Sequence, residues 1–130
     1  MATREYRNRF DGWDLLLQIL SGFAGGLTLA VVGTVVGSWL SPAGADPALG
    51  GVIGLVAGYP LGVGLGIWLA GRRERPASFA LAALGAYLGA GVVLLGLALG
   101  LSGELPYLWA LIAVFSLAGG LVGHALAARR

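Results

Sequence analysis

Four ionisable side chains have the types and placement to do chemistry at one end of the chain's predicted helices. Asp11 and Asp14 stand three residues apart in "FDGWD", and Glu74 and His124 fall at the same predicted level of a membrane. Carboxylates and an imidazole that converge there could hold a divalent metal for phosphate-ester chemistry on lipid headgroups. The alternative needs no metal, because Asp11 suits an N-cap and Asp14 suits the first helical turn. We expect capping, and no catalytic, metal or cofactor site.

His124 and one polar helical face are further candidates. His124 lies shortly before the terminal arginine pair, where the helix dipole favours it and its side chain can reach the membrane interface. A proton-coupling or ligand role is the alternative, since ionisable groups inside membranes are rare. Gln18, Ser21, Gly25 and Thr28 share one face within about 80°, which we expect to point into a bundle and bond its neighbours. A polar lining for a small solute is the alternative there.

The elements that position these residues are apolar segments of membrane-spanning length. Of the 130 residues, 58% are hydrophobic and 11% charged, and the mean hydropathy is +0.87. The charges leave four gaps, each able to hold a segment of about 20 residues, which crosses a hydrocarbon core. The sequence therefore predicts an all-α integral membrane protein with four helices, at about 15–40, 48–71, 77–101 and 105–128. The first is too long for a cleaved signal peptide.

The basic residues predict the orientation. All eight are arginines, and they lie before the first predicted helix, between the second and third, and after the fourth. The other two connections, "SPAGADPA" and "SGELP", carry one acid each and no base. We therefore expect both termini in the cytoplasm of a prokaryote, with anionic lipid as a partner at that face of the cytoplasmic membrane. The arginines are spread over three short pieces, which argues against a nucleic-acid partner.

Aromatic residues mark the predicted membrane interfaces. Three aromatic residues precede the first apolar segment at helical spacing and follow or alternate with the N-terminal arginines, which is typical of an interfacial segment: Tyr6, Phe10 and Trp13. Trp39, Trp68, Tyr107 and Trp109 stand near predicted helix ends. We expect these rings to anchor the helices in the headgroup layer.

Glycines recur at helical spacing in every predicted helix. In lipid, a row of glycines lets two backbones approach until dispersion and Cα–H···O contacts accumulate. The row of the first helix forms a narrow stripe suited to one partner, whereas the row of the second turns by about 160° from Gly50 to Gly66. We expect the second helix to meet more than one neighbour and to be the most buried, or to reach a second protein. The predicted helix-packing residues of this glycine zipper are Gly22, Gly26, Gly33, Gly37, Gly50, Gly54, Gly58, Gly62, Gly66, Gly85, Gly89, Gly96, Gly100, Gly119 and Gly123.

The spacing also indicates an internal repeat. Gly22, Gly26, Gly33 and Gly37 recur 63 residues later with the same intervals, and the end of the second helix matches the end of the fourth at an offset of 57. We expect one transmembrane domain built from two parallel hairpins, about 10–73 and 76–130, related by a pseudo-twofold axis along the membrane normal. Four unrelated glycine-rich helices are the alternative.

Pro60 interrupts the second predicted helix near its middle. A proline there removes the hydrogen bond to the Val56 carbonyl and predicts a kink, which serves either packing or a hinged binding site. Few polar residues lie at the predicted midplane, which favours a non-catalytic protein whose glycines bind other transmembrane helices, in a homo-oligomer or as an accessory subunit. The alternative is a transporter or channel for a small neutral or lipid-like solute, with Pro60 as hinge and the Gln18 to Thr28 face as lining.

Overall fold

The part of the chain that the structure describes forms four helices. The computed structural model describes residues 12–71, 78–100 and 105–127, and each helix in it is long and apolar enough to cross a membrane. The bounds are α1 Gly12–Trp39, α2 Pro47–Gly71, α3 Phe79–Ala98 and α4 Leu105–Ala127. The prediction of four membrane-spanning helices is confirmed, with ends that differ by at most three residues.

Local chemistry explains where α2 begins. The Ala48 N–H donates a 2.9 Å hydrogen bond to Asp46 Oδ1, so Asp46 caps the helix, and Pro47 follows at the first helical position. Before the cap, the Ala45 N–H bonds to the Pro42 carbonyl, and Gly44 takes a φ of 92°. A turn of this kind needs a residue that tolerates positive φ, which glycine does without strain.

The end of α3 corrects one prediction. Gly100 lies just beyond the helix with a φ of 93°, and its N–H bonds to the Leu97 carbonyl. A Cβ at Gly100 would meet nothing within 4 Å. Gly100 therefore terminates α3, as glycine commonly does after a helix, and does not pack against another helix. For the same reason α3 stops at Ala98 and not at the predicted residue 101.

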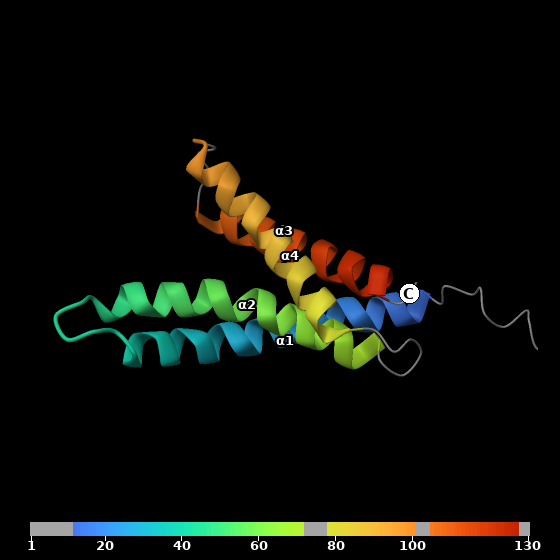
Figure 1. Cartoon of the computed structure of the whole chain (residues 1–130), viewed down its shortest axis with the longest axis horizontal. Coiled ribbons are helices and arrows are strands. Elements are labelled where there is room, and N and C mark those ends of the chain that lie inside the picture. Colours follow the sequence, from blue (N-terminus) through green and yellow to red (C-terminus); the bar gives the residue numbers. More distant parts are fainter. Residues whose placement is uncertain (1–11, 72–77, 101–104, 128–130) are drawn as a thin grey trace, which may run out of the picture.

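The helices form two antiparallel hairpins, α1–α2 and α3–α4, that cross each other (Figure 1). We call the end where α1 and α3 begin and α2 and α4 finish the terminal end, and the opposite end the loop end. The hairpins lie side by side at the terminal end and diverge toward the loop end (Figure 1). Within the described residues α2 contacts all three other helices, whereas α1 and α3 do not touch. As predicted, α2 is the most buried helix.

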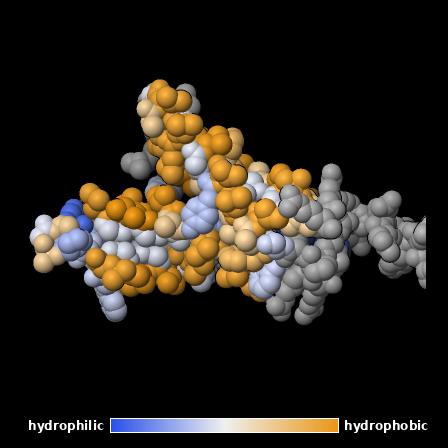
Figure 2. Space-filling model, in the orientation of Figure 1, coloured by the Kyte–Doolittle hydropathy of each residue, from blue (hydrophilic) through white to orange (hydrophobic). Residues whose placement is uncertain are grey.

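The shared core lies where the hairpins converge. Val63 and Ile67 of α2 are fully buried and meet the small residues of α3, among them Ala86 and Ala90. Most large apolar side chains face outward instead, and they cover much of the surface (Figure 2). In water such a surface would promote aggregation, whereas in a bilayer it is the surface expected to face the lipid.

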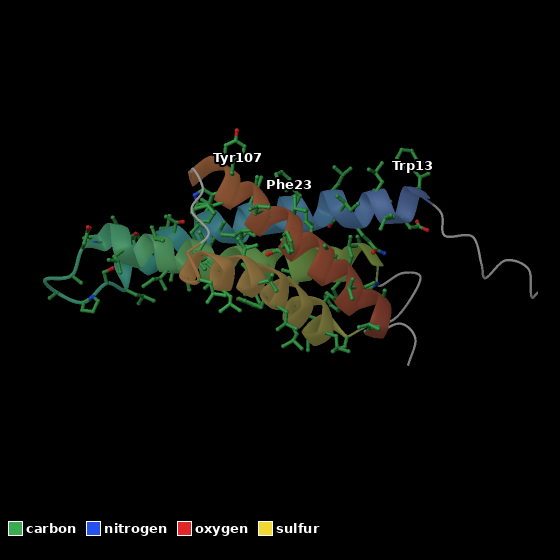
Figure 3. All side chains as sticks on the ribbon, turned by 90° about the horizontal axis from the view of Figure 1, so that it is seen from above. Trp13, Phe23 and Tyr107 are labelled. Atoms are coloured by element: carbon green, nitrogen blue, oxygen red, sulfur yellow. The ribbon has the colours of Figure 1, made fainter. Side chains whose placement is uncertain are left out.

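Aromatic side chains stand at both ends of the bundle. Trp13 at the start of α1 and Tyr107 at the start of α4 are 71% and 68% exposed, and both project away from the helices (Figure 3). Trp39 at the end of α1 is also exposed. Trp68 differs, since its ring packs edge to face on Phe79 at a centroid distance of 6.0 Å. The exposed rings have the placement that interfacial anchors require.

Candidate functional site

The glycine row of α2 contacts α1 along its whole length. Each step of four along α2 is matched by a step of four back along α1, so that a Cβ on any of these glycines would run into an α1 backbone carbonyl. The facing pairs are Gly50 with Gly37, Gly54 with Gly33, Gly58 with Leu29, Gly62 with Gly25, and Gly66 with Ser21.

This pairing corrects the prediction that the α2 row needs more than one neighbour. Rows of step four on both helices pack into each other at a negative crossing angle, and the two helices then coil around one another. Because α1 follows the turning glycine row, this one helix contacts every glycine of the row from Gly50 to Gly66. The other contacts of α2 use other faces: Gly64 backs onto Ala83 of α3, which the sequence analysis missed because Gly64 lies outside the row.

The second hairpin is joined in the same way. Gly85 of α3 faces the carbonyl of Gly119 in α4, Gly89 faces that of Phe115, and Gly123 faces that of Leu81. Gly22 and Gly26 of α1 have different surroundings, since a Cβ there would meet the side chains of Ile67 and Tyr59. The offset of 63 therefore pairs residues whose contacts differ, Gly22 with Gly85 and Gly26 with Gly89. Gly96 is half-buried in α3.

An apolar groove of about 560 Å³ opens beside the α1–α2 hairpin in its loop-end half. Its lining comes from α1, the α1–α2 connection and α2, with Tyr87 contributed by α3. The α1–α2 seam is visible as a pale band of near-neutral residues between strongly apolar ones (Figure 2). Asp46 and Ser41 line the groove at the loop end, whereas Gly58, Leu61 and Tyr87 line it near mid-helix. The groove thus runs lengthwise from a polar mouth at the loop end to an apolar inner end at mid-helix.

Tyr87 lines the inner end and forms a hydrogen bond between the hairpins. Its hydroxyl donates to the carbonyl oxygen of Ala57 in α2 at 2.6 Å. Ala57 lies three residues before Pro60, which is fully buried and supplies no N–H to this turn, although α2 continues through it. The sequence analysis did not single out Tyr87. A hydroxyl in the middle of an otherwise aliphatic helix was the available signal.

A second polar cluster lies at the terminal end. His124 of α4 is only 4% exposed, so it points into the bundle and not to the interface as predicted. A Cβ on Gly71 would collide with His124 Nε2 and would lie 3.1 Å from Gln18 Nε2. The structure therefore brings together two predicted candidates, Gln18 and His124, around the last residue of α2. The absence of a side chain at Gly71 makes room for both.

The rest of the predicted polar face does not line a path. Thr28 is exposed, and its hydroxyl bonds to the Ala24 carbonyl of its own helix at 2.9 Å. Ser21 is half-buried and contacts Gly66 through its carbonyl. A threonine in a membrane helix satisfies its hydroxyl on the preceding turn when no neighbour offers a better acceptor. The face thus separates into Gln18 inside the bundle and Thr28 outside it.

Two further hydroxyls are buried where the helices converge. Tyr59 is 7% exposed and Ser116 is 0% exposed, and neither hydroxyl has a hydrogen-bond partner within the part of the chain that the structure describes. Tyr59 packs its ring against Gly26. Of the predicted acidic candidates, Asp14 lies in the first turn of α1, while Asp11 and Glu74 fall outside the described residues. In the described ranges no three His, Asp or Glu residues gather as metal ligands.

The chain was compared with protein-family models, curated proteins and solved structures. None of them matches. Its function must be inferred from its own geometry.

Proposed function

We propose that the protein is a non-catalytic integral membrane protein that binds one lipid-like molecule in the groove along its α1–α2 hairpin. The observation that carries this proposal is the groove itself, which is elongated and apolar and reaches Tyr87 at mid-helix. Its volume of about 560 Å³ lies within the range of about 300–1,000 Å³ that small-molecule sites occupy. An apolar groove in a bilayer does not hold water, so an acyl chain is its natural content.

A transmembrane helix of a second copy or another subunit is the second candidate occupant. Gly33, Gly37, Gly50, Gly54 and Gly58 line the groove, and small residues are what helix interfaces in membranes use. The same glycines already face each other across the α1–α2 seam, so no unused row is left for a partner in that hairpin. A helix with side chains is about 10–12 Å wide, which favours the thinner acyl chain as the occupant.

Binding fits the groove better than conduction does. Along α2 the groove lining ends at Leu61, and the fully buried Val63 and Ile67 of the shared core follow it. A transporter would have to move the hairpins apart at this core, with Pro60 as the hinge. Flux of a lipid-like solute that Pro60→Ala changes would revive this alternative.

We further propose that the two hairpins are copies of one unit held by glycine rows, with the pseudo-twofold axis along the membrane normal. Three facing pairs of the first hairpin recur in the second if α1 maps onto α3 at an offset of 60 and α2 onto α4 at 57. Buried positions follow the same offsets, with Gly22, Gly26 and Ala30 matching Ala82, Ala86 and Ala90. The unpartnered Tyr59 and Ser116 are then equivalent.

The arginines support an orientation with the terminal end in the cytoplasm of a prokaryotic cell. The groove then opens toward the outer leaflet, and anionic lipids gather at the opposite face. A reporter fused to the C-terminus that functions only in the periplasm tests this orientation. Activity of that reporter would reverse the assignment.

A groove-filling substitution tests the proposed function. Ala57 is exposed and lines the groove, so Ala57→Phe should occupy the space of the ligand, whereas Ala118→Phe enlarges an exposed α4 residue outside the groove lining. We expect native mass spectrometry of protein extracted in a mild detergent to show one retained lipid per chain in the wild type and in Ala118→Phe. Retention should fall about tenfold in Ala57→Phe.

Equal retention in all three proteins would overturn lipid binding in the groove. Loss of a dimer or of a bound subunit in Ala57→Phe alone would instead establish the second candidate, a helix in the groove. Circular dichroism of each variant checks that the helical content is unchanged.

A further inference from the structure

The mouth of the groove carries one charged residue, and that residue is acidic. Asp46 lies in the groove lining at the loop end and is exposed to its surroundings. One of its oxygens, Oδ1, accepts the capping hydrogen bond from Ala48, which leaves the other carboxylate oxygen for a ligand. The Ser41 hydroxyl stands beside it in the lining and donates to the Gly37 carbonyl.

None of the residues that line the groove is basic. In the sequence, all eight basic residues precede α1, lie between α2 and α3 or follow α4, outside the described residues. The connection from Leu40 to Asp46 carries Asp46 as its single charge. A phosphate group on an anionic headgroup would meet a like charge here, whereas a headgroup amine would meet an opposite one.

We propose that the groove selects a phospholipid with an amine-bearing, zwitterionic headgroup, with the ammonium group on Asp46 and one acyl chain running down to Tyr87. This inference rests on the proposed function, since it assigns the headgroup of the molecule that the groove binds. The acyl chain supplies most of the affinity, because the lining below the mouth is apolar. Asp46 supplies the discrimination between headgroups.

The capping role of Asp46 allows a variant that changes its charge without changing the helix cap. Asn caps helices about as well as Asp, so Asp46→Asn removes the charge and keeps the hydrogen bond to Ala48. Asp14→Asn removes a charge at the terminal end and serves as the matched control. Ala45 also lines the mouth, and Ala45→Lys adds an ammonium group without touching the cap.

The experiment uses the full chain in bilayer discs of equal phosphatidylethanolamine and phosphatidylglycerol content, with retained lipid identified by native mass spectrometry. We expect the wild type and Asp14→Asn to retain the ethanolamine lipid over the glycerol lipid in a ratio of about two to five, which corresponds to one solvent-accessible ion pair. Asp46→Asn should retain both lipids equally. Ala45→Lys should prefer the anionic lipid.

Two failures are distinguishable. If Ala57→Phe does not lower the total retained lipid, the proposed function falls and the headgroup assignment falls with it. If Ala57→Phe lowers retention while Asp46→Asn keeps the wild-type headgroup ratio, the groove binds lipid but Asp46 does not select the headgroup.

Enrichment of the anionic lipid by the wild type would also overturn the headgroup assignment. A preference that survives high salt unchanged would contradict its electrostatic origin.

Discussion

The Tyr87 hydroxyl of α3 donates a 2.6 Å hydrogen bond to the Ala57 carbonyl of α2 and so links the two hairpins at mid-helix. Tyr87 also lines the groove beside the α1–α2 hairpin. A carbonyl oxygen has two lone pairs, so Ala57 can accept this bond without leaving the helix. We expect this contact to hold α3 against α2 beside the groove.

Tyr87→Phe should broaden the distribution of distances between α2 and α3. The substitution keeps the ring and removes one hydrogen bond, which in membrane proteins contributes about 0.6 kcal/mol on average. The chain has no cysteine, so Val52→Cys and Val92→Cys, exposed on α2 and α3, provide unique spin-label sites. We expect a broader, longer distance distribution in Tyr87→Phe than in the doubly labelled parent. Identical distributions would show that the hydrogen bond does not restrain the hairpins.

Gly54→Ala should destabilise the α1–α2 hairpin. Its Cβ would overlap the carbonyl oxygen of Gly33, a backbone atom that cannot rotate away, so the helices would have to separate. Overpacking of this kind costs about 1–3 kcal/mol. Gly91→Ala is the matched control, because a Cβ there meets nothing within 4 Å. Thermal unfolding in detergent should show a lower midpoint for Gly54→Ala only, and a wild-type midpoint for it would refute backbone contact at this pair.

Gly71→Ala should destabilise the terminal end through His124. The added Cβ collides with the imidazole, which is buried and has little room to move. His124→Ala removes the obstacle at the cost of a cavity. We expect the double variant to be more stable than the sum of the two single effects, by about 0.5–3 kcal/mol, as neighbouring residues show in such cycles. Additive free energies of unfolding would mean that the two residues do not touch.

Gly100→Ala should lower stability although it meets no neighbour. Its φ of 93° disfavours any side chain, at a cost of about 1–2 kcal/mol. Gly91→Ala again provides the control, since both positions have open space but Gly91 lies within the helix. The free energies of unfolding of the two variants, measured by steric trapping or detergent titration, should differ by about this amount. Equal values would contradict the turn conformation.

The sequence by itself determined the elements of this protein. Apolar segments between charges predict four helices, because a bilayer offers the backbone no other hydrogen-bond partners. Asp46 and Pro47 at the start of α2 act through local bonds that a reader of the sequence can anticipate. The sequence also places the small residues on rows of step four.

What each row faces was decided by the tertiary structure. The angle by which the glycine row of α2 turns does not reveal the path of the partner helix. From the sequence, the row from Gly50 to Gly66 therefore indicates several neighbours, whereas in the structure α1 contacts all of it. His124 points inward because Gly71 and Gln18 leave it a space. The groove is formed by α1, α2 and their connection with Tyr87 added from α3, and Tyr87 meets Ala57 across thirty residues of chain. Contacts between distant segments depend on packing in three dimensions, which no local pattern encodes.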